Sequence, residues 1–434
     1  MKIVMIGTGY VGLISGLCFA EFGFQVICVD KNKKHTNMLK KRKMPIYEPG
    51  LDNLFYKHFF KTKKIKLSND LKKSVKSADV VFITVGTPSR RIDGDADLKS
   101  VYNVTNEIAD SINKYCLIVT KSTVPVGTSK KIKEILEKKV DKKLFDVASN
   151  PEFLREGSAI EDFMRPNRIV IGVESKKAEK ILKKLYSPLF IIKTPIITTN
   201  LETAEIIKYA SNSFLATKIS FINQVADLCE KVGADVQDVS KAMGLDKRIG
   251  SKYLHVGPGF GGSCFPKDVI AFVSTSKKHR IQMSIVDSVN KSNLKRPIDI
   301  SKKIIKFFSN NVKNKSFALL GLSFKPNTDD IRDSTSIIIG NELIKAGAKI
   351  ICYDPLSMPK TKAKFPKFII SKSVLRACKN VDAIILGTEW NEFRSLNFKK
   401  IKNIVKKPIL FDLRNIYNPK GIEKLGWEYK SIGR

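Results

Sequence analysis

The segment from Gly257 to Asp268 sets a cysteine among glycines and charged residues. Four glycines, at positions 257, 259, 261 and 262, are expected to keep side-chain bulk away from the sulfur of Cys264. Lys267 follows three residues later, and a nearby cation favours the thiolate, the reactive form of cysteine. Asp268 can act as a base or position a water molecule. The pattern predicts a nucleophilic cysteine, because a buried structural cysteine in a turn needs neither the lysine nor the aspartate.

The other cysteines have different surroundings. They lie in apolar segments typical of strands or helices, where a free cysteine is usually a small core residue. They show no CxxC pair and no metal-ligand spacing. These six are Cys18, Cys28, Cys116, Cys229, Cys352 and Cys378. The sequence therefore predicts no metal centre and singles out Cys264 as the reactive thiol.

A glycine pattern near the N-terminus is typical of a dinucleotide site. Gly7, Gly9 and Gly12 follow an apolar strand-like run and open a helix-like one, and Asp30 closes the next strand-like run 18 residues after Gly12. The first glycine makes the turn, the second lets the backbone approach the pyrophosphate, and the third permits close helix–strand packing. The aspartate accepts from the ribose hydroxyls and repels a 2′-phosphate. The pattern therefore predicts NAD rather than NADP.

A nicotinamide cofactor and a nucleophilic cysteine together predict the oxidation of an aldehyde to an acid. The thiolate adds to the aldehyde, hydride leaves to NAD, and the thioester that results is hydrolysed.

Other polar clusters could assist this chemistry. Asn150 and Pro151 predict a helix N-cap and first turn after a strand, so that Glu152 and Glu156 would share one helix face. Lys208 and Asn212 are likewise four residues apart in a long helical segment, and a lysine there could stabilise an oxyanion. The segment 121–128 follows a strand, where cofactor-facing loops lie in such sheets. Taken alone, each pair is more often part of a solvated surface.

The elements that must position these residues alternate between strand and helix in both halves of the chain. Alternation of this kind predicts parallel, doubly wound sheets. The expected strands are 2–6, 25–29, 80–85, 117–120, 146–149, 169–172, 316–320, 349–353, 383–386 and 409–412. Residues from about 200 to 293 read as helices only. We therefore expect an α/β protein with an N-terminal domain at 1–198, a central helical domain at 199–296 and a C-terminal Rossmann-like domain at 297–434.

Two features of the composition could suggest other classes. The net charge is +36, but the lysines are spread along the whole chain in short clusters, without a basic arm, so we expect no nucleic-acid partner. The run from Ile3 to Ala20 is uncharged, yet four glycines interrupt it and Glu21 follows directly. It predicts a buried strand, turn and helix rather than a membrane span or a signal peptide. We expect a cytoplasmic protein.

Six motifs, in order along nearly the whole chain, resemble those of the UDP-glucose/GDP-mannose dehydrogenase family. They are GTGYVGL at 7–13, VGTPS at 85–89, STVPVGT at 122–128, NPEFLREGSA at 150–159, GFGGSCFPKD at 259–268 and GLSFKPNTDDIRDS at 321–334. The resemblance implies a four-electron oxidation of the C6 alcohol of a nucleotide sugar to a carboxylate, with two NAD per sugar. It implies two Rossmann-like domains joined by a long central helix, with NAD bound by the first and the UDP-sugar by the last.

The same resemblance implies roles for individual residues. The reaction would use Cys264 as the nucleophile, Lys208 and Asn212 to stabilise oxyanions, Asp268 to position water, Glu152 for proton transfer or thioester hydrolysis, and Thr123 near the reacting centre. NAD would contact Gly7, Gly9, Val11, Gly12, Asp30, His35, Thr87, Thr123, Glu156, Lys267 and Arg332. The sugar nucleotide would contact Glu152, Phe153, Leu154, Arg155, Glu156, Lys208, Asn212, Arg248, Tyr253, Leu254, His255, Val256, Gly257, Gly261, Lys325 and Arg414.

The resemblance also implies a homodimer through the central domain, with Arg248 supplied by the partner subunit. His35 departs from the pattern, since many family members carry a lysine there against the cofactor.

Several alternatives remain open. Ser263, Phe265 and the Arg248-Ile249-Gly250 segment favour UDP-glucose over GDP-mannose and UDP-N-acetylmannosamine, which the same chemistry would also oxidise. A two-electron β-hydroxyacid or 6-phosphogluconate-type dehydrogenase shares the domain plan but needs no cysteine nucleophile. If the protein were a non-catalytic polyanion binder, the pattern around Cys264 and Asp268 would have no explanation.

Overall fold

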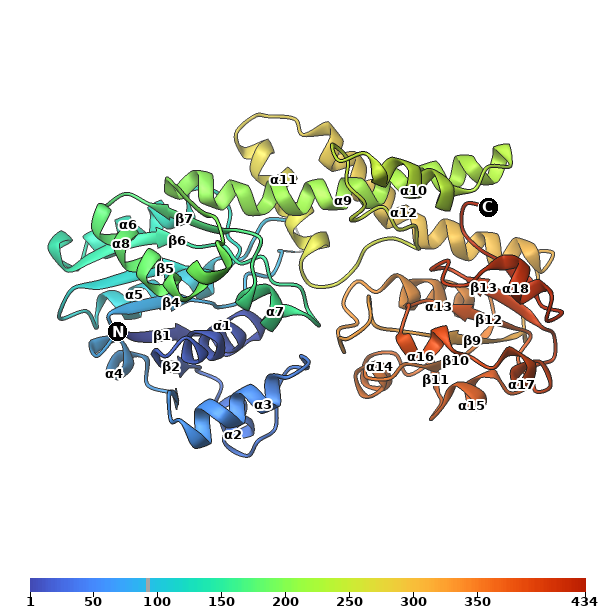
Figure 1. The fold of residues 1–434 in the computed structure, drawn as a ribbon, viewed down its shortest axis with the longest axis horizontal. Coiled ribbons are helices and arrows are strands. Elements are labelled where there is room, and N and C mark those ends of the chain that lie inside the picture. The colour runs from blue at the N-terminus through green and yellow to red at the C-terminus, as the bar shows by residue number, and fades with distance from the viewer. Residues whose placement is uncertain (91–93) are drawn as a thin grey trace. The chain divides into compact units, whose positions relative to one another are not determined.

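The structure is a computed structural model that describes residues 1–90 and 94–434 (Figure 1). The chain divides into two compact units. The first comprises Met1–Ser211 together with Ser274–Ile281, and the second comprises Asn212–Val273 together with Gln282–Arg434. Each unit contains one sheet, which agrees with the α/β fold expected from the sequence.

The first unit is built on an eight-stranded sheet with the order β3-β2-β1-β4-β5-β6-β7-β8. Its strands are β1 (Lys2–Ile6), β2 (Gln25–Val29), β3 (Ile65–Ser68), β4 (Val80–Ile83), β5 (Cys116–Thr120), β6 (Phe145–Ser149), β7 (Ile169–Val173) and β8 (Ile196–Thr199). Successive residues of β1 enter different cores, Ile3 and Met5 on one face and Val4 and Ile6 on the other. Burial on both faces explains why these strands are continuous apolar runs.

Two details of this sheet differ from the expectation. The strands β6 and β7 run antiparallel, whereas the other neighbours are parallel. The strands β3 and β8 were not expected, because both are short, contain polar residues and are partly exposed at the two edges of the sheet.

The helices of the first unit connect these strands. They are α1 (Tyr10–Glu21), α2 (Lys33–Lys40), α3 (Leu51–Tyr56), the π-helix η1 (Lys57–Lys61), α4 (Leu71–Lys76), α5 (Lys99–Ala109), α6 (Thr128–Glu137), η2 (Lys142–Leu144), α7 (Ala159–Met164), α8 (Lys176–Leu185) and η3 (Ser187–Ile192). Helix α1 is buried throughout from Gly12 to Ala20, which accounts for the uncharged N-terminal run. Within the described residues, no helix is both long and apolar enough to cross a membrane.

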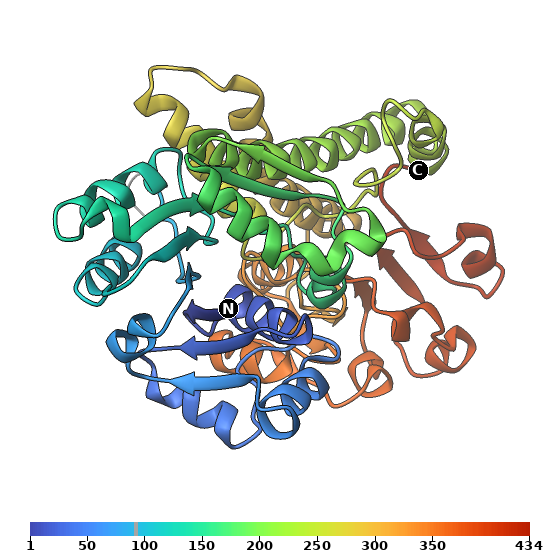
Figure 2. The same cartoon turned by 60° about the vertical axis from the view of Figure 1, so that its left-hand side comes forward.

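Four helices follow the first sheet in the sequence: α9 (Leu201–Val232), α10 (Val236–Leu245), α11 (Phe265–Lys278) and α12 (Ser284–Phe307). Helix α9 is continuous over 32 residues (Figure 1). Its C-terminal part packs against α12, where the buried guanidinium group of Arg296 donates to Asp227 Oδ2 at 2.8 Å and to the carbonyl of Asn223 at 3.0 Å. The turned view also shows the two helices side by side (Figure 2).

The second unit carries a six-stranded, all-parallel sheet with the order β11-β10-β9-β12-β13-β14. The strands are β9 (Ser316–Leu320), β10 (Lys349–Tyr353), β11 (Ile369–Ile370), β12 (Ala383–Leu386), β13 (Ile409–Asp412) and β14 (Glu428–Lys430). The helices are α13 (Thr335–Lys345), α14 (Met358–Lys364), α15 (Val374–Cys378), α16 (Asn391–Arg394), α17 (Phe398–Lys402) and α18 (Pro419–Glu423). This order repeats that of the first six strands of the first sheet, so both sheets have the dinucleotide-fold topology.

Candidate active site

The glycine turn after β1 has the geometry that the sequence pattern predicts. Gly7 has φ +105°, a left-handed value that favours glycine, and a Cβ on Gly12 would lie 1.9 Å from the carbonyl oxygen of Gly7. A Cβ on Gly9, in contrast, would meet no atom within 4 Å. The backbone is therefore open at Gly9, where a diphosphate would approach the N-terminus of α1.

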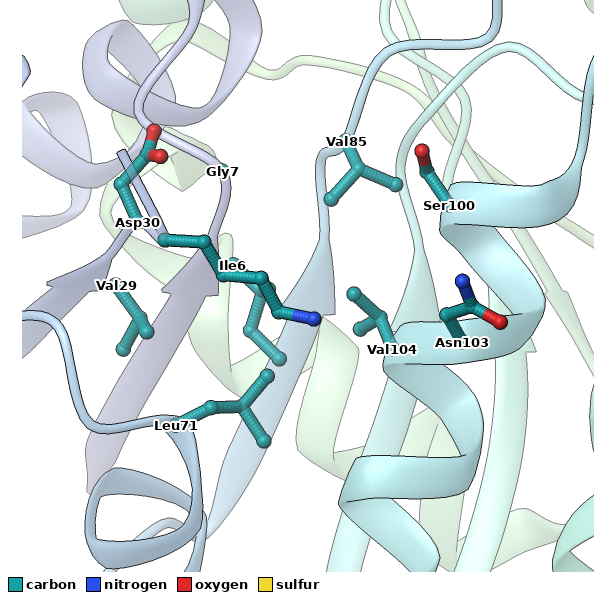
Figure 3. A pocket seen from close by; sticks show the side chains of 10 residues that line it. Ile6, Gly7, Val29, Asp30, Leu71, Val85, Ser100, Asn103 and Val104 are labelled. Atoms are coloured by element: carbon teal, nitrogen blue, oxygen red, sulfur yellow. The ribbon is translucent and has the colours of Figure 1, made fainter. Parts of the chain in front are cut away.

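Asp30, at the end of β2, lies beside this turn. Its Oδ2 accepts hydrogen bonds from the backbone N of Thr8 at 2.9 Å and from Thr8 Oγ1 at 2.5 Å. Asp30 and Gly7 also line a pocket of about 180 Å³. Figure 3 shows the Asp30 carboxylate on one side of this pocket, with Ser100 and Asn103 of α5 on the other. A carboxylate beside an open glycine turn fits the ribose and diphosphate of NAD.

The other residues predicted to contact the cofactor are more widely distributed. Val11 lies in the first turn of α1, and His35 lies in α2, where its backbone N donates to Asn32 Oδ1 at 3.4 Å. Thr87 Oγ1 donates to the carbonyl of Thr123 at 2.8 Å, so these two predicted residues are in contact. In the second unit, the guanidinium group of Arg332 pairs with Asp330, with Nη2 to Oδ2 at 2.8 Å.

Two predicted catalytic residues of the first unit form a buried ion pair. Lys208 Nζ of α9 donates to Glu152 Oε1 at 3.1 Å, and the two side chains are only 4% and 5% exposed. The other carboxylate oxygen of Glu152 accepts from the backbone N of Leu154 at 2.6 Å. The ring of Phe153 lies 5.3 Å from Lys208 Nζ and 3.5 Å from the guanidinium carbon of Arg168. Such a pair can hold a carboxylate ready for proton transfer beside a cation.

The expected helix over the Glu152–Glu156 segment is wrong. The chain from Asn150 to Ser158 forms a loop, and α7 begins only at Ala159. Asn150 does not cap a helix, because its side-chain oxygen accepts instead from Lys121 Nζ at 3.0 Å. Glu152 and Glu156 therefore do not share a helix face, and Glu152 is buried while Glu156 is partly exposed.

Distant residues hold this loop in place. The buried carboxylate of Glu48 accepts from the backbone N of Gly157 at 2.7 Å and of Ala159 at 2.6 Å, and the hydroxyl of Tyr10 also donates to it. Arg155 pairs with Asp162, with Nη2 to Oδ1 at 2.6 Å. The exposed Arg155 thus supports the loop in this structure.

The loop that carries Thr123 is anchored from α9. The carboxylate of Glu205 accepts from the backbone N of Gly127 and of Ser129, both at 2.7 Å. It thereby satisfies free N–H groups at the start of α6. Burial raises the pKa of Glu205 to about 7, against the lowering effect of these hydrogen bonds.

In the second unit, Cys264 directly precedes α11, and its carbonyl accepts the helical hydrogen bond from the N of Asp268 at 2.9 Å. The sulfur therefore sits at a helix N-terminus, where the helix dipole and free N–H groups favour a thiolate. Cys264 is partly exposed, whereas the six other cysteines are buried. Sequence reasoning attributed thiolate stabilisation to Lys267 and missed this helix start.

Asp268 is fully buried one helical turn after Cys264. Its Oδ2 accepts from Asn212 Nδ2 of α9 at 2.6 Å, and its Oδ1 accepts from Lys267 Nζ at 2.5 Å. The predicted residues Asn212, Lys267 and Asp268 are thus brought together. A carboxylate held by an amide and an ammonium group can orient a water molecule toward a carbon bonded to the neighbouring sulfur.

Two glycines of the cysteine loop are also required by close packing, which was not expected from the sequence. A Cβ on Gly261 would lie 2.2 Å from the carbonyl oxygen of Asp333, and one on Gly262 would lie 2.7 Å from the ring of Phe324. The backbone N of Gly262 donates to the carbonyl of Arg332 at 2.9 Å. The glycines therefore let the cysteine loop pack closely on the 324–333 segment. This contact joins two motifs that are some 60 residues apart in the sequence.

The segment before the cysteine loop is fixed in the same unit. The backbone N of Gly257 donates to Asn223 Oδ1 at 2.9 Å, and its carbonyl accepts from Arg296 Nε at 2.7 Å. A Cβ on Gly257 would lie 3.1 Å from the guanidinium group of Arg414. Tyr253 has a positive φ of 65°. Leu254 and Val256 are buried in the core and His255 is exposed.

Two further predicted substrate contacts have other neighbours. Arg248 is 89% exposed and pairs with Asp246 of its own loop at 2.6 Å. Lys325 lies with its Nζ 5.4 Å from the centre of the Phe324 ring.

The structure also reveals polar residues that sequence reasoning did not assign. Lys121, Tyr186, Glu48 and Glu205 are all buried and all bind the loops that carry the predicted residues. Only Lys121 had a signal in the sequence, since it immediately precedes the motif at 122–128.

The comparisons with known proteins cover all parts of the chain. Sequence signatures of the UDP-glucose/GDP-mannose dehydrogenase family match its NAD binding domain at residues 1–190, its central domain at 202–295 and its UDP binding domain at 318–419. A UDP-glucose 6-dehydrogenase of Rhizobium meliloti is 48% identical over 100% of both chains.

Solved structures agree with the sequence comparison. A UDP-glucose dehydrogenase from Pyrobaculum islandicum superposes with a TM-score of 0.90 and 33% identity, covering 99% of this chain and 96% of that one. A UDP-D-ManNAc dehydrogenase from Pyrococcus horikoshii gives a TM-score of 0.87 and 26% identity, covering 100% and 99%. The chain therefore belongs to the UDP-glucose/GDP-mannose dehydrogenase family.

Proposed function

We propose that this NAD-dependent dehydrogenase oxidises the C6 alcohol of UDP-glucose to the carboxylate of UDP-glucuronate, through a covalent intermediate on Cys264. The observation that carries the proposal is the buried Asp268, held by Asn212 at 2.6 Å, one helical turn from Cys264 at the start of α11. A two-electron alcohol dehydrogenase needs neither the cysteine nor a carboxylate set beside it. The 48% identity to a UDP-glucose 6-dehydrogenase supports UDP-glucose as the substrate.

NAD would be held by the glycine turn and Asp30. The open approach at Gly9, the helix N-terminus behind it and the carboxylate at the pocket edge suit a diphosphate and a ribose. When bound, NAD accepts a hydride in each of the two oxidations.

The residues of the chain supply the remaining chemistry. After the first oxidation, the thiolate of Cys264 forms a bond to the aldehyde carbon, and the carbonyl π electrons move to the oxygen. Lys208 and Asn212 stabilise the negative charge on that oxygen. Loss of hydride from the same carbon then leaves a thioester on the sulfur.

Hydrolysis regenerates the enzyme. A water molecule oriented by Asp268 attacks the thioester carbon, the C–S bond breaks, and the sulfur leaves as thiolate. Glu152 takes up or returns the protons, in its buried pair with Lys208. Thr123 lies in a loop fixed by Thr87 and Glu205 and would border the reacting centre.

The family description of residues 318–419 as a UDP binding domain supports a UDP-sugar site in the second unit. Gly257, Gly261 and Arg414 would form part of it, since Arg414 lies against Gly257 and Gly261 packs on Asp333. GDP-mannose and UDP-N-acetylmannosamine are the alternative substrates.

We further propose three domains, at 1–198, 199–296 and 297–434, a cytoplasmic location and a homodimer formed by the central domain. Exposed apolar side chains support the dimer: Phe214, Phe221 and Leu228 recur every seven residues along α9 and are 64%, 48% and 61% exposed. Such a row on one helix face is typical of a helix–helix interface. Arg248, exposed on its own chain, would reach the partner's site.

The stoichiometry of the reaction tests the proposed function. Purified protein is given excess NAD and limiting UDP-glucose, and the NADH formed per sugar consumed is counted. Two NADH with UDP-glucuronate and no free aldehyde are expected. One NADH per sugar would contradict the covalent mechanism. Two NADH with another nucleotide sugar and none with UDP-glucose would show that the other sugar is the substrate.

A further inference from the structure

Lys121 is a buried cation for which the proposed mechanism has no use. It follows β5, is 3% exposed, and donates from Nζ to Asn150 Oδ1 at 3.0 Å and to the hydroxyl of Tyr186 at 3.3 Å. The Tyr186 hydroxyl itself donates to Asn150 Oδ1 at 2.6 Å. Across residues 1–90 and 94–434, no carboxylate forms an ion pair with Lys121. Burying an ammonium group on neutral partners is costly, so its presence calls for a reason.

The partner of Lys121 leads directly to the Glu152 loop. Asn150 is bound on three sides: its backbone N donates to the carbonyl of Thr120 at 2.9 Å, and its Nδ2 donates to the carbonyl of Val170 at 2.8 Å. Lys121 binds the remaining side-chain oxygen. Asn150 thus attaches the start of the loop to β5 and β7, two residues before Glu152.

Lys121 is also coupled to Glu152 by charge. Both residues line one small pocket of about 40 Å³, together with Asn150 and Tyr186. Burial lowers the pKa of Lys121 to about 8, the negative charge of Glu152 opposes this shift, and the positive charge of Lys208 adds to it. Because such interactions are mutual, the ammonium of Lys121 must in turn stabilise the Glu152 carboxylate.

We propose that Lys121 is a positioning residue of the reaction: through Asn150 it fixes the loop that carries Glu152, and its charge holds the Glu152 carboxylate in the buried pair with Lys208. The inference rests on the proposed function for its catalytic consequence. The electrostatic part concerns three side chains of one unit and can be measured without substrate.

The experiment is a double-mutant cycle between Lys121 and Glu152. Lys121→Gln removes the charge and keeps a donor for Asn150, and Glu152→Gln removes the carboxylate charge. The unfolding equilibrium is measured in urea for the wild type, both single variants and the double variant. Glu152→Gln should cost less in the Lys121→Gln protein than in the wild type, and the two unfolding constants should be non-additive by about tenfold or more.

A second variant tests the same coupling in case Lys121→Gln does not fold. Asn150→Asp preserves the shape at this position but places a new carboxylate against Lys121, so it should likewise reduce the cost of Glu152→Gln. Tyr186→Phe is the matched control, because it removes one neutral partner of Lys121 and should combine additively with Glu152→Gln. Additivity within about twofold for both Lys121→Gln and Asn150→Asp would overturn the proposal.

Kinetics then separate a positioning role from a packing role. Lys121→Gln should lower kcat about 10- to 100-fold and leave the KM for NAD unchanged, since a small misplacement of a catalytic group acts on the chemical step. The loss of kcat caused by Lys121→Gln should be largely absent when Glu152 is already replaced by glutamine. A raised KM for NAD, or an equal loss of kcat in both backgrounds, would contradict the proposal. Absence of any NADH from the wild type would contradict the proposed function alone, since the unfolding cycle stands without turnover.

Discussion

At the scale of single residues, the proposed chemistry depends most on Cys264 and its neighbours. The sulfur stands at the N-terminus of α11, and the side chain of Asp268, one turn later, is fixed by Asn212 and Lys267. A helix start favours a thiolate, and in the proposed reaction the fixed carboxylate would direct the water that releases the product. Removing the sulfur should therefore affect the acid-forming steps and spare binding.

Cys264→Ser should bind NAD and UDP-glucose with affinities within about threefold of wild type and release UDP-glucuronate at least about a thousandfold more slowly. Serine lacks the nucleophilicity and the leaving ability of a thiolate. Product chromatography measures the loss, and intact-protein mass spectrometry detects any adduct that persists on the serine. Turnover at the wild-type rate would show that Cys264 is not the nucleophile.

The glycine turn offers a matched pair of substitutions. Gly12→Ala should lower the free energy of unfolding by about 3 kcal/mol, because its Cβ would lie 1.9 Å from the carbonyl oxygen of Gly7. Gly9→Ala meets no atom and should change stability by less than about 1 kcal/mol. It should nevertheless weaken NAD binding about tenfold or more, since the new methyl group occupies the diphosphate approach. Urea unfolding and calorimetric titration with NAD distinguish the two; tight NAD binding by Gly9→Ala would argue against this site.

At the scale of elements, the active-site loops are held by buried carboxylates from distant parts of the chain. Glu48 binds the end of the Glu152 loop, and Glu205 of α9 binds the first N–H groups of α6. An acid at a helix N-terminus satisfies free donors and interacts favourably with the helix dipole. The Thr123 loop, which leads into α6, thus depends on a residue of another helix.

The titration of Glu205 makes this support depend on pH. Its pKa rises from 4.5 to about 7 in the folded protein because burial disfavours the charged form. Because the folded protein binds this proton more tightly than the unfolded chain does, the raised pKa contributes its full stabilisation below pH 4.5. That contribution is lost as the pH rises through 7. The loss should amount to roughly 3 kcal/mol.

Glu205→Gln has no such titration, so its free energy of unfolding should fall less than that of the wild type between pH 4.5 and pH 7.5. Urea unfolding of both proteins at the two pH values measures the difference. Glu202→Gln is a suitable control, because Glu202 lies in the same helical turn but pairs with the exposed Lys130. Parallel pH dependences for wild type and Glu205→Gln would contradict the raised pKa.

At the scale of the whole molecule, the proposed homodimer predicts that subunits can complement one another. If Arg248 acts in the partner's site, Cys264→Ala and Arg248→Ala homodimers should each be inactive. Mixed after dissociation, they should regain about a quarter of wild-type activity, because half the dimers are mixed and one of two sites in each has both residues intact. Turnover after mixing measures the recovery, and no recovery would place Arg248 in its own subunit's site.

The apolar row on α9 provides the corresponding test of assembly. Phe221→Glu should yield monomers by light scattering, because a charge would replace a side chain that the dimer buries. Lys231→Glu, on the same helix but outside the row, should remain dimeric. A dimeric Phe221→Glu protein would show that the dimer interface lies elsewhere.

The sequence by itself determined the parts of this protein that depend on local pattern. Apolar runs predicted all the inner strands of the two sheets described and none of their edge strands, because a strand buried on both faces must be apolar throughout. The glycine turn at Gly7 and the glycine-rich loop at Cys264 were equally visible, because backbone close to a ligand or to other backbone leaves no room for a side chain. Fold class and cofactor follow from such patterns, and the same kind of pattern predicts Cys264 as the nucleophile.

Only the tertiary structure decided how the polar residues are held. The segment after Asn150 has the sequence of a helix start, yet it forms a loop, because Lys121 takes the oxygen that would have capped the helix and Glu48 binds the N–H groups at its end. The partners of a buried polar group are chosen by the fold, often from far along the chain, and burial makes each of those bonds obligatory. No periodicity in the sequence encodes such a choice, so the supports of the site became visible only in three dimensions.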